Sequence, residues 1–264
     1  GILSLIWPDG PDQMPPQAPD GTTIIASPGQ WREIGTALAP YVADLQQHLA
    51  QPLASGRSRR DALCWAALAH DWGKPANRTV EEGGRIRFFD HDQWGARLVE
   101  ERLQALRFSS DEIAYVARLT ALHMRPGELA NQEPVTRRAG YHFFRDAGST
   151  GPDVAVLSLA DYLATLAPAL AGAEPHAPEA ARWRSRVEVA RHLLETYFRE
   201  RETRVSPAPL LDGRQVMAEL GLPPGPAIGV LLEGLAEAQA VGQVRTRDEA
   251  LAWLREQPGA IHRE

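Results

Sequence analysis

The chain has 264 residues, a formal net charge of -6 and a single cysteine, Cys64. This length suits one large domain with a smaller addition, because hydrophobic cores stop growing near about 250 to 300 residues. No apolar run approaches the roughly 18 residues of a membrane helix, so we expect a cytoplasmic protein without membrane contact. One cysteine excludes a disulfide framework and a cysteine-based zinc cage, and the acidic charge argues against attraction to nucleic acid over the whole surface.

Residues 1–29 are predicted to form an irregular lead-in because proline, glycine and aspartate recur there without periodicity. The first helix is expected from Trp31 to about Leu53, where apolar residues recur three and four positions apart. Pro40 lies inside this segment and predicts a kink.

A second helix is expected from Ser58, because Ser58 and Asp61 have the spacing of a capping box. The residues that follow are apolar on nearly every side, which indicates a buried helix, and Gly73 and Pro75 end it. Residues 78–89 alternate around Glu-Glu-Gly-Gly, which predicts a small β-hairpin.

The remaining periodic segments all predict helices, so the expected fold class is all-α. These helices are expected at 90–106, 109–124, 152–166, 183–203, 212–220, 226–239 and from 246 onward. Ser206-Pro207-Ala208-Pro209 has the composition of a linker. We therefore expect a large helical domain over residues 1–204 and a small helical tail domain over residues 207–264.

The strongest chemical signal is His70-Asp71 at the end of the buried helix. Two polar groups that end an apolar segment are costly to bury without partners. A divalent cation binds both imidazole nitrogen and carboxylate oxygen, and the C-terminal end of a helix favours positive charge. For an isolated pair, an ordinary polar helix end is the alternative reading.

Three further residues suggest that the pair is part of a larger cluster. Asp161 lies on an apolar helix face, where a carboxylate needs a counter-charge. His91 stands in the first turn of its helix and His123 in the last turn of another, although each alone is compatible with a surface histidine. Helix ends are where side chains converge on a pocket, so we predict one metal site from these residues: His70, Asp71, His91, His123 and Asp161.

This pattern resembles the HD superfamily of metal-dependent phosphohydrolases, and more closely the HD body and C-terminal tail of the bacterial tRNA nucleotidyltransferase and poly(A) polymerase family, the CCA-adding enzymes. The resemblance covers about residues 30–254, and the motifs that carry it are HDWGKP at 70–75, the hairpin, FFDH at 88–91, LHMRP at 122–126, Asp161 and the tail stretch 210–229. It implies an HD-domain helical bundle with one small hairpin. It also implies metal ligation by His70, Asp71 and Asp161, with His91 and His123 available for a second metal or the substrate phosphate.

Two departures from the family keep an alternative open. The superfamily's first histidine corresponds to Gly35 here, and His48, about 20 Å further along an ideal helix, is expected to be a surface residue. The paired carboxylates and Gly-Ser or Gly-Gly turn of a nucleotidyltransferase head are not found, so this chain is not expected to transfer nucleotides by itself.

The favoured function is that of a metal-dependent phosphohydrolase or phosphodiesterase acting on a nucleotide or RNA phosphate. The cofactor would be a divalent ion, Mn, Ni, Fe, Co, Zn or Mg, which activates a bound water. Lys74, the only lysine, would hold the substrate phosphate as a point charge. Arg78 and Arg125 are further phosphate contacts by bidentate geometry, with solvated or carboxylate-paired arginines as the alternative.

The alternative function is a noncatalytic RNA-binding body, with tRNA as a partner and a degenerate metal site. Seven arginines against four glutamates lie between residues 182 and 204, and Arg184 and Arg191 could track RNA phosphates. Gly225 opens a helix whose free amides could accept a phosphate. A solvated face with internal ion pairs competes with this reading, and the sequence leaves the oligomeric state open.

Overall fold

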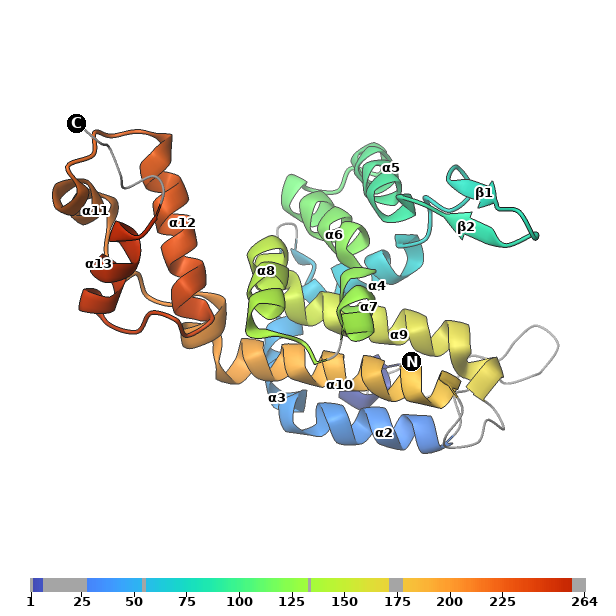
Figure 1. The fold of residues 1–264 in the computed structure, drawn as a ribbon. Helices are drawn as coiled ribbons and strands as arrows, with labels where there is room; N and C mark the ends of the chain where they lie inside the picture. Colours follow the sequence, from blue (N-terminus) through green and yellow to red (C-terminus); the bar gives the residue numbers. More distant parts are fainter. Residues whose placement is uncertain (1, 7–27, 54–55, 133, 171–177, 258–264) are drawn as a thin grey trace. The chain divides into compact units, whose positions relative to one another are not determined.

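The computed structural model describes residues 2–6, 28–53, 56–132, 134–170 and 178–257, and these residues are mostly helical (Figure 1). Most of the lead-in and residues 171–177 lie outside the described residues. The all-α fold class is confirmed. Among the described residues, no helix is long and apolar enough to cross a membrane.

The chain divides into two compact units, which are described one at a time. The first unit combines residues 1–134 and 147–195, and the second combines residues 135–146 and 196–264. The expected domains over 1–204 and 207–264 stay a prediction.

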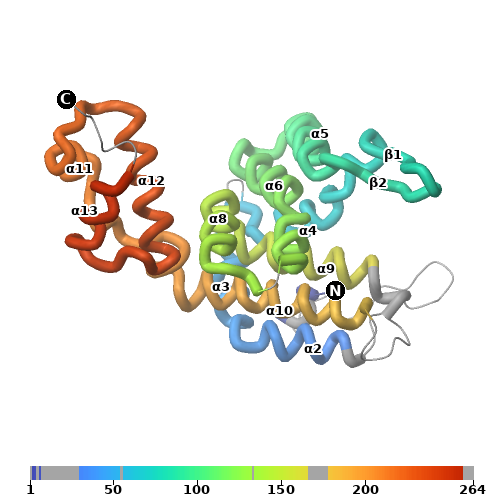
Figure 2. The backbone as a smooth tube through the Cα atoms, in the orientation of Figure 1, coloured from blue at the N-terminus to red at the C-terminus, as the bar shows by residue number. Residues whose placement is uncertain are grey.

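The first unit follows the chain through a series of helices that Figures 1 and 2 trace from blue to orange. In chain order its helical elements are α1 (Leu3–Ile6), α2 (Pro28–Leu38), η1 (Ala39–Tyr41), α3 (Val42–Leu49), α4 (Arg59–Ala69), α5 (His91–Ala105), α6 (Ser110–Leu122), α7 (Arg125–Leu129), η3 (Ala130–Gln132), η4 (Gly148–Thr150), α9 (Gly151–Leu170) and most of α10 (Pro178–Arg199). The side chain of Trp183 on α10 stacks on Tyr162 of α9 and donates a hydrogen bond to Glu33 of α2. This indole therefore links three helices.

The expected kink at Pro40 is a complete change of helix type. Proline lacks an amide hydrogen, and residues 39–41 form a 3-10 turn that separates α2 from α3. The predicted helix over 31–53 therefore exists as two α-helices, both of which bury their apolar positions.

Two of the predicted helix starts are confirmed with their capping boxes, Ser58 with Asp61 for α4 and Ser109 with Glu112 for α6. The start at Asp90 differs. Asp90 has a left-handed backbone with φ of 55° and its side chain makes no capping hydrogen bond, although α5 begins at the next residue as expected. Here the hairpin sets the direction of the chain, so Asp90 serves as a turn residue.

The hairpin is confirmed, with β1 (Arg78–Val80) paired antiparallel to β2 (Ile86–Phe88). Gly83 and Gly84 both have positive φ in its turn, as a tight connection between short strands requires. Arg78 pairs with Phe88, so the second strand ends three residues before His91.

Two helices between residues 125 and 147 were not foreseen from the sequence. The first is α7, which follows the predicted helix over 109–124 and has Pro126 in its first turn, where a missing amide hydrogen costs nothing. The second, α8 (Arg137–Ala147), buries Tyr141, Phe143 and Phe144. Tyr141 and Phe144 are three positions apart, so this helical spacing is visible in the sequence.

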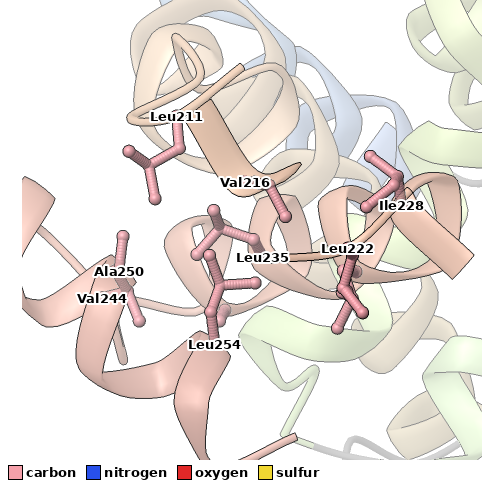
Figure 3. Close-up of a cluster of buried hydrophobic side chains, with 10 residues drawn as sticks. Leu211, Val216, Leu222, Ile228, Leu235, Val244, Ala250 and Leu254 are labelled. Carbon is pink, nitrogen blue, oxygen red and sulfur yellow. The ribbon is translucent and has the colours of Figure 1, made fainter. Parts of the chain in front are cut away.

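The second unit contains α8 up to residue 146, the end of α10, the π-helical turn η5 (Arg201–Val205), α11 (Gly213–Leu220), α12 (Pro226–Ala240) and α13 (Arg247–Arg255). The three predicted tail helices are thereby confirmed, with capping boxes at Asp212 and Thr246. Figure 3 shows the apolar core that joins them, to which Leu211, Val216, Leu235, Ala250 and Leu254 contribute.

His48 was expected at the surface, and this prediction is wrong. The residue is 4% exposed, and its Nε2 lies 2.6 Å from Oδ2 of Asp153, which is fully buried. The hydroxyl of Tyr115 donates to the other oxygen of Asp153 at 2.6 Å. Helical spacing could not reveal this contact because the two partners are 105 positions apart.

The buried carboxylate of Asp153 gives a first prediction. Asp153→Ala leaves His48 and Tyr115 without this partner, so we expect the free energy of unfolding to fall by about 3 kcal/mol. Urea denaturation measures the change, with the exposed Asp248→Ala as control. A loss no larger than that of the control would contradict a stabilising role for the network.

Glu112 gives a second prediction, on pH. Burial raises the pKa of this carboxyl, but hydrogen bonds from Ser109 and the Arg57 guanidinium outweigh it, so the pKa is lowered. A carboxyl group whose pKa is lower in the folded state than in the unfolded state stabilises the fold at pH values above the unfolded-state pKa. This stabilisation is lost as the pH falls through the folded-state pKa. We expect wild-type stability to fall between about pH 5 and 3 more steeply than that of Glu112→Gln, measured by urea denaturation. Equal slopes would contradict this assignment.

Candidate metal centre

The five predicted metal ligands come together in the first unit. His70 and Asp71 follow α4, His91 begins α5, His123 follows α6 and Asp161 lies within α9. They form two groups whose potential ligand atoms lie within 4.8 Å of one another, and Asp71 belongs to both. One group is Asp71, His91 and His123, and the other is His70, Asp71 and Asp161.

The three histidine rings are held in the same way. Each ring places Nδ1 close to a backbone carbonyl oxygen three residues earlier: His70 at 2.9 Å from Ala67, His91 at 2.8 Å from Phe88, and His123 at 2.7 Å from Thr120. A carbonyl oxygen only accepts hydrogen bonds, so Nδ1 carries the proton in each ring. In the neutral rings Nε2 is then left with a free lone pair, which is how proteins usually prepare histidine for a metal.

The Nε2 atoms point at one another and at the carboxylates. His91 Nε2 lies 3.3 Å from His123 Nε2, and Asp71 Oδ1 lies 3.6 Å from His91 Nε2 and 4.0 Å from His123 Nε2. Oδ1 of Asp71 is buried and makes no hydrogen bond among the described residues. Two lone pairs and a buried carboxylate oxygen facing one another need a cation or a proton between them.

The second group carries more negative charge. His70 Nε2 lies 3.3 Å from Asp161 Oδ1 and 3.4 Å from Asp71 Oδ2. Burial lowers the pKa of His70, but these two carboxylates outweigh it and raise the pKa to about 10. Desolvation tends to raise the pKa of Asp161, and the bond to His70 reverses this and lowers it.

His123 shows the opposite behaviour. Its side chain is 1% exposed, and burial, together with the charges of His70 and His91, lowers its pKa. Burial therefore favours the neutral ring of His123, whereas the two carboxylates favour the protonated form of His70.

A glycine lets these elements approach closely. A Cβ on Gly73 would lie 2.0 Å from the carbonyl oxygen of His91 and 2.8 Å from the amide nitrogen of Gly95. The turn after α4 therefore packs directly on the backbone of the first turn of α5. A Cβ on Gly95 would lie 3.3 Å from Cγ2 of Thr120 on α6 and 3.3 Å from the amide nitrogen of Gly73. Helix α5 therefore packs closely against both α6 and the turn after α4.

The predicted phosphate contacts are distributed differently. Lys74 donates to Asp71 Oδ2 at 2.6 Å, so it lies directly beside the cluster. Arg125 pairs with Glu128 at 3.7 Å, and Arg78 is an exposed residue of β1.

The predicted RNA contacts are separate from the metal ligands. Arg184 and Arg191 line a hollow of about 510 Å³ between α2 and α10, and Arg191 also pairs with Glu188 at 2.5 Å. Gly225 precedes α12 in the second unit, with extended φ and no side chain to cap the helix.

Arg186 was not among the predicted site residues, although its charge interacts with that of Asp161. Its guanidinium carbon lies 4.8 Å from the ring centroid of Tyr162, the residue after Asp161, and a Cβ on Gly127 would lie 1.8 Å from its Nη1. Burial lowers its pKa, yet it makes no ion pair with a carboxylate within the described part of the chain. The signal was available, because Arg186 is three residues after buried Trp183 and four before buried Ala190.

The close approach at Gly73 gives a third prediction. Gly73→Ala must displace the first turn of α5 and with it His91, so we expect a loss of about 2 kcal/mol in unfolding free energy and weaker metal retention. Thermal unfolding and elemental analysis measure the two effects. Gly140→Ala is the control, because a Cβ there meets nothing within 4 Å. Similar behaviour of both variants would contradict the steric argument.

Comparison with known proteins agrees with this geometry. The family model of the HD domain matches residues 38–166. The chain is 37% identical over 190 residues to the CC-adding tRNA nucleotidyltransferase of Thermus thermophilus, covering 72% of this chain and 38% of that protein. It is 34% identical over 203 residues to the A-adding tRNA nucleotidyltransferase of Deinococcus radiodurans, covering 75% and 43%.

The chain thus spans about two fifths of the length of these curated relatives. Gly35, the position assigned to the absent first histidine, lies before the matched residues, whereas all five clustered ligands lie within them. Residues 38–166 of the chain therefore match the HD domain family, and about three quarters of the chain is similar to CC- and A-adding tRNA nucleotidyltransferases.

Proposed function

We propose that the first unit is a metal-dependent phosphohydrolase that uses two cation positions sharing Asp71. The observation that carries the proposal is the free Nε2 lone pair of His91 and His123 opposite the unpartnered Oδ1 of Asp71. Three imidazoles among the five ligands suit a transition-metal ion better than Mg²⁺, so we propose Mn, Fe, Co, Ni or Zn ahead of Mg.

Each residue has a separate task in this proposal. His91 and His123 would hold one cation, His70 and Asp161 would hold the other, and Asp71 would bridge them with its two oxygens. A bound divalent ion lowers the pKa of a water ligand and polarises a phosphoryl oxygen. The carbonyls of Ala67, Phe88 and Thr120 hold the rings so that the Nε2 atoms converge.

The substrate phosphate would be held by cations at the edge of this cluster. Lys74 already lies beside Asp71, and its ammonium group can exchange that carboxylate for a phosphate oxygen when Asp71 binds metal. Arg186 is the second contact that we propose, with Arg78 and Arg125 as further candidates. The substrate class is a nucleotide or RNA phosphate ester, because both relatives are tRNA nucleotidyltransferases.

The alternative proposal is a noncatalytic tRNA-binding body. The names of the relatives favour it, together with Arg184 and Arg191 on α10 and the free start of α12 at Gly225. In this case the HD cluster would be a structural remnant.

The fourth prediction tests the shared carboxylate. Asp71→Asn removes a ligand from both groups, so we expect the purified protein to lose both metal ions. We also expect hydrolysis of bis-p-nitrophenyl phosphate with added Mn²⁺ or Ni²⁺ to fall at least about 100-fold. His91→Asn removes a ligand from one group only and should retain about half of the metal. Elemental analysis and the hydrolysis assay give the two readouts, with Asp111→Asn at the exposed start of α6 as control.

Two outcomes would contradict the proposal. Wild-type protein that neither retains metal nor hydrolyses the ester with added Mn²⁺, Ni²⁺ or Co²⁺ would favour the RNA-binding alternative. Equal metal content in Asp71→Asn and Asp111→Asn would place any bound metal elsewhere. Circular dichroism of each variant shows whether the helical fold is kept.

A further inference from the structure

The second unit contains a hollow of about 470 Å³ that none of the preceding functions uses. Its walls come from the start of α8, the π-helical turn η5 and the segment after it, and the end of α12 with the loop that leads to α13. We infer that this hollow is a binding site for a phosphate group, formed by the guanidinium groups of Arg137 and Arg245. The inference concerns the second unit alone and does not rest on the proposed metal centre.

The two guanidinium groups meet at Gly242. A Cβ on Gly242 would lie 2.8 Å from Nη1 of Arg137 and 3.8 Å from Nη2 of Arg245. Because both distances start from the same point, Nη1 of Arg137 and Nη2 of Arg245 are no farther apart than the sum of these two distances. Gly242 has φ of 83°, in the left-handed region, so the chain turns sharply here and has no side chain to keep the arginines apart.

The charges around this point are incompletely balanced. Among the described residues, neither Arg137 nor Arg245 has an ion pair between its guanidinium and a carboxylate. The third arginine of the hollow, Arg204, pairs with Glu200 at 2.8 Å. Glu202 also lines the hollow, and it makes no ion pair with either Arg137 or Arg245. Two neighbouring guanidinium groups without a shared carboxylate repel each other, and an oxyanion between them would remove this repulsion.

Phosphate matches the donors better than a smaller anion does. A guanidinium offers parallel N–H groups that suit two oxygens of a phosphate, so two arginines can bind one group from two sides. The wall next to them is also unusual, because η5 is a π-helical turn and such turns are rare and frequently occur at functional sites. Convergent arginines, a left-handed glycine and a π-turn are three separate features of one hollow.

Two sources could supply the phosphate, a free phosphate ion or the backbone of an RNA chain. They are distinguished with the full chain and two probes, inorganic phosphate and a tRNA transcript. The variants are Arg137→Gln, Arg245→Gln and the double substitution. Arg214→Gln is the control, because Arg214 is an exposed arginine of the same unit that lies outside the hollow.

For an RNA source, we expect each single variant to weaken tRNA binding about tenfold. The slope of log K against log salt should become shallower by about 1, because one phosphate is no longer neutralised. The double variant should lose the same single unit of slope, since both arginines serve one phosphate. For a free-phosphate source, inorganic phosphate should raise the unfolding temperature of wild type but not of the double variant, with tRNA binding unchanged.

The inference fails if the variants bind tRNA and respond to phosphate as Arg214→Gln does. A slope change of about 2 in the double variant also overturns it, because the arginines would then contact separate phosphates. Misfolding is recognised independently: without phosphate, both single variants should unfold at the wild-type temperature or slightly above it, since each removes one of two repelling charges.

Discussion

The position of the histidine protons determines what the HD cluster can do. Ala67, Phe88 and Thr120 each offer a carbonyl to the Nδ1 of a histidine three residues later. These carbonyls lie at the ends of α4 and α6 and at the end of β2, where backbone oxygens are not used by a regular hydrogen-bond ladder. The ends of three elements thus fix three tautomers, and the fixed tautomers direct three Nε2 atoms into one space.

The convergence of the Nε2 atoms also requires close packing between helices of the first unit. Nε2 atoms converge only if the turn after α4 lies directly on the start of α5, and Gly73 permits this approach. The left-handed backbone of Asp90 contributes as well, because it turns the chain from the hairpin into α5 and places His91 in the first helical turn. Gly73 and Asp90 are far apart in the sequence, yet both contribute to the convergence of the histidine Nε2 atoms.

The sequence predicted the parts of this structure that depend on neighbouring residues. Capping boxes at Ser58, Ser109 and Thr246 place hydrogen-bonding groups three positions apart, so their helices could be located from the sequence. Contacts between distant residues could not be found in this way. His48 appeared exposed because its partner Asp153 belongs to another helix, and Arg186 appeared to be one arginine among seven on a charged helix.

The two halves of the cluster also differ in a way that only the folded structure reveals. His91 and His123 are both buried and face the same oxygen of Asp71, and burial lowers the pKa of His123. His70 lies between two carboxylates that favour its protonated form. A divalent ion held by His91 and His123 would use their Nε2 lone pairs, whereas His70 would have to release a proton before its Nε2 could bind one. Asp71 would contribute to both positions, because it belongs to both ligand groups. The proposed centre would therefore depend on Asp71 more than on any other ligand, since each of the remaining four residues belongs to one group only.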